Sequence, residues 1–214
     1  MEFIELMNRV GHLPIIDTEI LLTGFDTSQQ ASLKVQIVRW TATGKLVQLR
    51  RGLYLLARPY RKAEPYGTYL ASVLTKPSYV SFEKALEYYD LIPEAVTIYT
   101  SVTTKRQARI DTPAGLFDYR HIQTPLFWGY SAVTLDRQTG FMASPEKALL
   151  DFIYFRKPEL SEAYFKEWRL QNLEVVSLKR LYEYAKRFQK PRINKATQFL
   201  GAYIERKAKR RGKP

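Results

Sequence analysis

The stretch DTSQQASLKVQIVRWTATGKLVQLRRGLYLL, residues 26–56, decides the fold of this chain. Apolar residues at helical spacing predict a helix from near Ser28 to about Thr43, with Gly44 as its stop. Strand-like sequence then continues to position 56, and two adjacent arginines divide it into two short strands. A helix followed by a hairpin with a basic tip is typical of the second half of a winged helix-turn-helix.

The predicted helix shows one polar strip and two apolar sides at about 100° per residue. The strip spans roughly 80° and consists of Gln29, Ser32, Gln36, Arg39 and Thr43. The two apolar sides are formed by Ala31, Val35, Val38 and Ala42, and by Leu33, Ile37 and Trp40. We therefore expect the helix to pack on both apolar sides and to expose the strip, as a helix that enters a major groove does.

The residue types on the strip and hairpin suit contacts to DNA. Gln pairs with adenine and Arg with guanine, while Ser reaches base edges or phosphate. Arginines at a hairpin tip suit phosphate or the minor groove. The candidate DNA-binding residues are Ser28, Gln29, Ser32, Lys34, Gln36, Arg39, Arg50 and Arg51. An ordinary solvated helix face is the alternative for the strip alone, and the hairpin that follows favours DNA binding.

The positive charge is concentrated in two segments. The net charge is +13, residues 34–62 hold eight bases and no acid, and residues 186–214 hold eleven bases and one acid. The sequence between them is close to neutral. Basic segments of this kind attract polyanions through phosphate contacts and counterion release. A solubilising surface charge is the plain alternative, and an anionic membrane surface is a weaker one.

Composition narrows the function classes further. The chain has no cysteine, which removes disulfides and thiolate metal sites, and its two histidines lie far apart in sequence. No glycine loop of a nucleotide-binding type is present. The single Glu-x-Lys, at Glu205-Arg206-Lys207, lacks the acid pair of a magnesium nuclease. We expect no enzyme activity, no metal and no cofactor.

The N-terminus lacks the basic start and apolar block of a signal peptide, and no apolar run reaches about 18 residues. We expect a cytoplasmic protein without a membrane span.

The predicted fold class is α+β. The chain is expected to begin with a winged helix-turn-helix in residues 1–60. A mixed α/β C-terminal domain with a helical C-terminus follows in residues 61–200, and a basic tail in residues 201–214. Ser81 and Ser144 are predicted helix caps.

Three blocks of sequence resemble the AbiEi-family antitoxins of bacterial type IV toxin–antitoxin systems. The first stands here as Trp40, Gly44, Leu46, Leu49, Arg50, Arg51, Gly52 and Tyr54. The second consists of Tyr79-Val80-Ser81, Lys84-Ala85-Leu86, Tyr88 and Leu91-Ile92-Pro93, and the third of Ser144-Pro145-Glu146-Lys147-Ala148-Leu149-Leu150-Asp151. The resemblance covers roughly residues 15–155, and it departs at Asp90, where the family commonly has a His-Gly-Leu type sequence.

The resemblance implies a transcriptional repressor whose winged helix binds repeats in its own promoter. It also implies that the C-terminal domain counters an AbiEii-type nucleotidyltransferase-like toxin, with no stable complex expected between the two proteins. Lys105, Arg106 and Arg109 form a second basic cluster, which we interpret as a partner or phosphate surface or, alternatively, as a solvated loop. A nuclease-like enzyme targeted by a winged helix and an RNA-binding protein are the rival functions.

Overall fold

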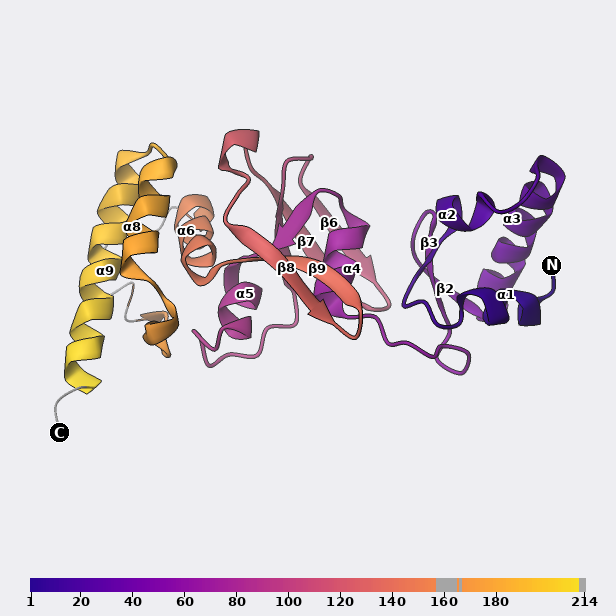
Figure 1. Ribbon diagram of the computed structural model, residues 1–214, viewed down its shortest axis with the longest axis horizontal. Helices are drawn as coiled ribbons and strands as arrows, with labels where there is room; N and C mark the ends of the chain where they lie inside the picture. Colours follow the sequence, from indigo (N-terminus) through magenta and orange to yellow (C-terminus); the bar gives the residue numbers. More distant parts are fainter. Residues whose placement is uncertain (157–164, 166, 212–214) are drawn as a thin grey trace.

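The computed structural model describes residues 1–156, 165 and 167–211 of the chain. They form a mixed α and β structure that ends in a long C-terminal helix. An N-terminal unit, a central sheet with its helices, and a C-terminal helix pair follow one another along the long axis of the molecule (Figure 1). The two termini therefore lie at opposite ends.

The N-terminal unit, residues 1–56, combines three helices with a small sheet. Its elements are α1 (Phe3–Val10), β1 (Ile16–Asp17), α2 (Thr18–Leu22), α3 (Thr27–Ala42), β2 (Leu46–Arg50) and β3 (Leu53–Leu56). The strands pair antiparallel in the order β1-β3-β2. The helix predicted from near Ser28 is α3, and its end before Gly44 agrees with the prediction.

Both faces of this small sheet are buried. Leu46 and Leu56 join a core with side chains of α1 and α3, among them Phe3 and Trp40. Leu53 and its neighbours Leu49 and Leu55 instead join the core of the central sheet. A strand covered on both sides reads as a continuous apolar run rather than an alternating one, which explains the sequence LYLL of β3.

The central sheet has six strands in the order β6-β7-β5-β4-β9-β8. Its strands are β4 (Ser78–Val80), β5 (Tyr99–Thr103), β6 (Ala108–Thr112), β7 (Gly115–His121), β8 (Tyr130–Leu135) and β9 (Gln138–Ala143). The pairs β5–β7 and β4–β9 are parallel, and the other pairs are antiparallel. The associated helices are α4 (Gly67–Leu74), α5 (Phe82–Tyr88), α6 (Pro145–Arg156) and the 3₁₀ turn η1 (Thr124–Leu126).

A buried polar network joins α6 to β4. Lys147 forms an ion pair with Asp151 one helical turn later, and both side chains are fully buried. Asp151 Oδ2 accepts hydrogen bonds from the Tyr79 hydroxyl at 3.0 Å and from Ser81 Oγ at 2.9 Å. Burial raises the pKa of the Asp151 carboxyl, and the Lys147 ammonium and these hydroxyl donors oppose that rise.

One predicted cap is confirmed and the other is wrong. Ser144 Oγ accepts from the Lys147 N–H at 3.2 Å at the start of α6. Ser81 precedes α5 but makes no side-chain cap there, because its hydroxyl donates to Asp151.

The C-terminal helix pair packs against α6. It consists of α8 (Leu178–Arg187) and α9 (Pro191–Arg211), preceded by the 3₁₀ turn η2 (Leu173–Val175). Tyr203 and Ile204 are buried, and Lys207 Nζ donates to the Leu170 carbonyl at 2.8 Å. The residues expected to form a tail from position 201 thus belong to α9 as far as Arg211. Among the helices of the described ranges, none is long and apolar enough to cross a membrane.

Candidate nucleic-acid interface

A capping box fixes the start of α3. The Gln29 N–H donates to Asp26 Oδ1 at 2.9 Å, and the Asp26 N–H donates to Gln29 Oε1 at 3.3 Å. Ser28 Oγ donates to the same carboxylate at 2.8 Å. These bonds hold the pKa of Asp26 below its ordinary value, the Gln29 N–H contributing most. Ser28 and Gln29, both candidate DNA contacts, therefore have side chains that are engaged in the cap.

The prediction that α3 packs on two apolar sides is wrong. Only the side with Leu33, Ile37 and Trp40 is buried. On the other side Val35 is 51% exposed and Val38 is 67% exposed. The core contacts only one side of α3. The side with the larger side chains is the buried one, because it removes more apolar area from water per residue.

The outer face of α3 is consequently wider than the polar strip and differently centred. We define it as the exposed residues Ala31, Ser32, Val35, Val38, Arg39 and Ala42. At about 100° per residue, Val35 lies at its centre and the other members lie within roughly 60° on either side. Gln36 lies about 100° from Val35, outside this face, and is half-buried. The outer face thus combines an apolar centre with one arginine and one serine.

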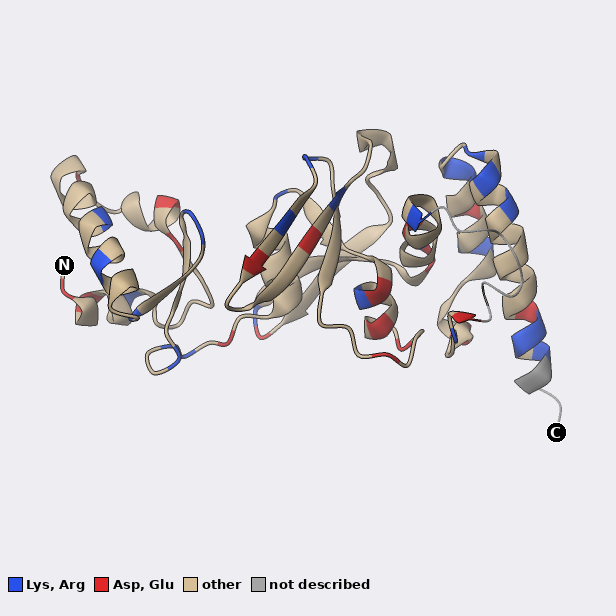
Figure 2. Cartoon of the chain, turned by 180° about the vertical axis from the view of Figure 1, so that it is seen from behind, with Lys and Arg blue, Asp and Glu red and all other residues tan. Residues whose placement is uncertain are grey.

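Basic side chains of α3 and of the hairpin that follows it are not paired with acids. Lys34, Arg39, Arg50 and Arg51 are exposed and form no ion pair within the described residues. Lys45, just after α3, instead lies over the Phe3 ring at 4.9 Å from its centroid. Basic residues recur on this unit at one end of the molecule and on α8 and α9 at the other (Figure 2).

The β2–β3 hairpin is short and firmly anchored. Arg50 pairs with Leu53, so Arg51 and Gly52 form the turn, where Gly52 has a φ of +85°. Glycine adopts this conformation without the steric cost that a Cβ brings. The Gly52 carbonyl accepts from the Thr18 N–H at 2.9 Å and from Thr18 Oγ1 at 3.1 Å. The hairpin tip is thereby tied to the first residue of α2.

The second basic cluster lies at the β6 edge of the central sheet. Lys105 and Arg106 are in the β5–β6 loop, and Arg109 is on β6, an edge strand of the central sheet that β2 approaches. The Lys105 carbonyl lies 2.9 Å from His121 Nδ1. The structure therefore places part of the cluster on a strand, and all three basic side chains are exposed.

In the part of the chain that the structure describes, no three His, Cys, Asp or Glu side chains are grouped so as to hold a metal ion. The exposed valines of α3 are the members of this interface that sequence reasoning placed inside the protein. The available signal was the difference in size between the two apolar sides of the helix.

A scan against protein-family models and a search of the curated proteins both gave no match to this chain.

Proposed function

We propose that the N-terminal unit is a winged helix-turn-helix and that the protein is a sequence-specific DNA-binding transcriptional repressor. The element order supports this proposal, because three helices, an early strand and a terminal hairpin surround one small core. The observation that carries it is the outer face of α3. A buried Leu–Ile–Trp side holds the helix in place, while the opposite side is exposed along the helix and carries Arg39, which forms no ion pair within the described residues.

In this proposal α3 lies in the major groove and the β2–β3 hairpin follows the backbone. Arg39 suits a guanine edge, and Arg51 at the hairpin turn suits phosphate. In the cluster of Lys105, Arg106 and Arg109, the last residue lies on β6, which contacts β2. The cluster would therefore extend the phosphate contacts beyond the N-terminal unit.

The role of antitoxin rests on the resemblance described above. We propose that the repressor binds repeats in its own promoter and that the central sheet and the C-terminal helix pair counter a nucleotidyltransferase-like toxin without forming a stable complex. Co-expression with a toxin encoded beside this gene tests that role. Growth should be restored by the full chain, and a toxin that stays lethal would refute the role without affecting DNA binding.

A mobility-shift titration with the DNA just upstream of the gene tests the repressor function. The wild-type chain should give a shift that resists scrambled competitor, and Arg39→Ala should lose about 1–3 kcal/mol of binding free energy. Lys179→Ala removes the same charge from an exposed site on α8 and should leave binding unchanged. Equal binding to scrambled duplex would refute sequence-specific recognition.

Two further arms address the rival functions. Stronger binding to structured RNA than to duplex DNA at matched salt would favour an RNA-binding protein, for which the basic residues of α8 and α9 provide a second surface. Cleavage of either nucleic acid in the presence of magnesium would favour a nuclease targeted by its winged helix.

A further inference from the structure

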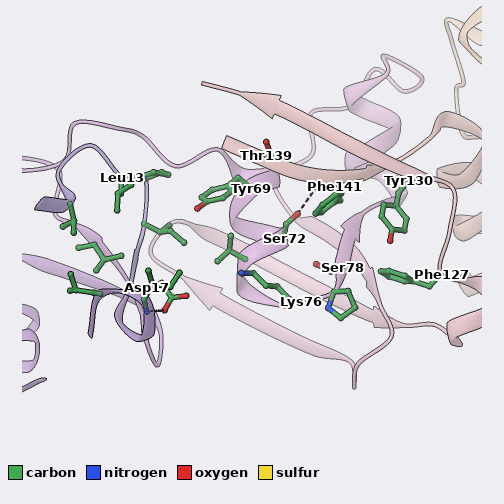
Figure 3. A pocket seen from close by; sticks show the side chains of 18 residues that line it. Leu13, Asp17, Tyr69, Ser72, Lys76, Ser78, Phe127, Tyr130, Thr139 and Phe141 are labelled. Carbon is green, nitrogen blue, oxygen red and sulfur yellow. Dashed lines mark hydrogen bonds between the residues drawn. The ribbon is translucent and has the colours of Figure 1, made fainter. Parts of the chain in front are cut away.

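A cavity of about 810 Å³ lies between the N-terminal unit and the central sheet (Figure 3). Its volume is within the range of roughly 300–1,000 Å³ that is usual for small-molecule sites, which favour boundaries between folded units. One wall comes from α1, β1, α2 and the residues that join them. The other comes from α4, β8, β9 and the segments next to them.

The two walls are apolar but differ in character. The wall of the N-terminal unit is aliphatic, with Leu13, Ile15 and Ile20 among its members. The opposite wall is aromatic, and it includes Tyr69, Phe127 and Phe141. Ile20 is 70% exposed, so the two units do not close over it. An open apolar cavity of this kind gains free energy when an apolar ligand displaces its water.

Among the polar groups that line the cavity, one charged side chain has no ion pair within the described ranges. Ser72 Oγ donates to the Thr68 carbonyl at 3.0 Å, and Ser78 Oγ donates to the Thr75 carbonyl at 2.6 Å. The Asp17 carboxylate accepts from the first N–H groups of α2, at 2.9 and 3.4 Å. Lys76 is exposed and has no ion pair within the described ranges.

We propose that this cavity binds an amphipathic small molecule with an apolar body and one anionic head group. The body fills the space between the aliphatic and aromatic walls. The head group lies at the Lys76 ammonium, which points toward the N-terminal unit (Figure 3). A ligand seated in this way touches both units and stabilises their present arrangement. The inference is independent of DNA binding.

The test is a fluorescence titration of the full chain with 1-anilinonaphthalene-8-sulfonate, which has an aromatic body and a sulfonate head. We expect enhanced, blue-shifted emission that saturates at a single site. The neutral probe N-phenyl-1-naphthylamine lacks the sulfonate and serves as the comparison. Lys76→Ala should lower the affinity for the anionic probe about fivefold or more, as expected for loss of one charge pair at a partly exposed site. The affinity for the neutral probe should stay unchanged.

Cavity-filling variants locate the bound probe. Ile20→Trp should lower the affinity of both probes by at least about tenfold, or 1.4 kcal/mol, because the indole occupies the site. Ile4→Trp is the matched control, since Ile4 is 66% exposed and does not line the cavity. Thr139→Trp fills the same space from β9 if the first variant fails to fold, which circular dichroism reports.

Three results would overturn the proposal. Absence of any emission change would show that the cavity takes no ligand of this class. Equal affinity in wild type and in both folded cavity-filling variants would place the probe elsewhere. If Lys76→Ala lowered the affinity of both probes equally, Lys76 would not contact the sulfonate. The site would then not select an anionic head group.

Discussion

Val35 occupies the centre of the face that the proposed winged helix presents to DNA. A valine there cannot donate or accept a hydrogen bond, and the contact available to it in a major groove is the C5-methyl group of thymine. Replacing thymine by uracil removes that methyl group and leaves every hydrogen-bonding position in place. Each lost methyl contact should weaken binding by about fourfold, since burying one such group contributes about 0.8 kcal/mol.

The measurement compares the binding affinities of operator duplexes that each carry a single thymine-to-uracil replacement. Wild type should show the loss at one or two positions, and Val35→Ala should show none there because its contact is already absent. Val175→Ala, a similar change at an exposed site of η2, should behave as wild type. Uracil sensitivity that persists in Val35→Ala would assign the methyl contact to another residue.

The buried pair of Lys147 and Asp151 makes a second residue-scale prediction. The Lys147 ammonium lies 4.9 Å from the Trp128 ring centroid and 5.0 Å from that of Phe188. Lys147→Met keeps most of this packing but leaves a buried carboxylate without its cation. We expect a loss of about 3–5 kcal/mol in the free energy of unfolding, measured with urea. Lys179→Met on the surface should change it by less than about 0.5 kcal/mol.

Tyr79→Phe separates the hydrogen bond from the ion pair. Burial and the neighbouring Asp151 raise the pKa of the Tyr79 hydroxyl well above its ordinary value, so it remains a donor at neutral pH. Its removal should cost about 1.5–3 kcal/mol, as for a hydrogen bond to a charged group. A loss as large as that of Lys147→Met would mean that the tyrosine, rather than the cation, holds the carboxylate.

At the scale of the element, the hairpin predicts a change in salt dependence. Arg50→Ala/Arg51→Ala should weaken binding to every duplex by a similar factor, because phosphate contacts do not distinguish sequences. The slope of log K against log salt concentration should become shallower by about 2 if both side chains contact phosphate. Lys179→Ala/Lys186→Ala, at two exposed positions of α8, is the charge-matched control. A loss confined to one sequence would instead place the arginines at base edges.

The elements that sequence could predict are those with strong local signals. Gly44 and Ser144 mark helix boundaries through conformations and hydrogen bonds that depend on neighbouring residues alone. The helix α3 ends before Gly44 and α6 begins after Ser144, as predicted. Strands β4, β6 and β9 were not predicted. Strand β4 has three residues, and its partners β5 and β9 lie far away in sequence, so no local pattern specifies it. Strands β6 and β9 instead form hairpins with the neighbouring strands β7 and β8.

The exposed side of α3 and the role of Ser81 depend on tertiary contacts. The two apolar sides of α3 differ in side-chain size, but only a tertiary core of limited width makes that difference decide which side is buried. Ser81 matches the pattern of a cap, but its hydroxyl reaches Asp151, 70 positions later in the chain. Long-range contacts decide both outcomes.

At the scale of the whole molecule, the doubly covered sheet makes the N-terminal unit dependent on the rest of the chain. One face of β1-β3-β2 packs against its own helices, and the other contributes Ile15, Leu49, Leu53 and Leu55 to the core of the central sheet. A fragment of residues 1–62 would expose these four side chains to water. Each contributes about 1.5–3 kcal/mol when buried, which is a large share of the stability of so small a unit.

We therefore expect the 1–62 fragment to unfold at a lower temperature than the full chain and to bind the operator more weakly, although it keeps α3 and the hairpin. Leu49→Thr/Leu53→Thr should improve the folding of the fragment, because the polar hydroxyls suit a water-exposed strand. The same pair should destabilise the full chain, where both positions are buried. Circular dichroism melts of the four proteins measure both effects. A fragment that melts and binds like the full chain would show that the shared core is dispensable, and the proposed reading unit would then be an independent domain.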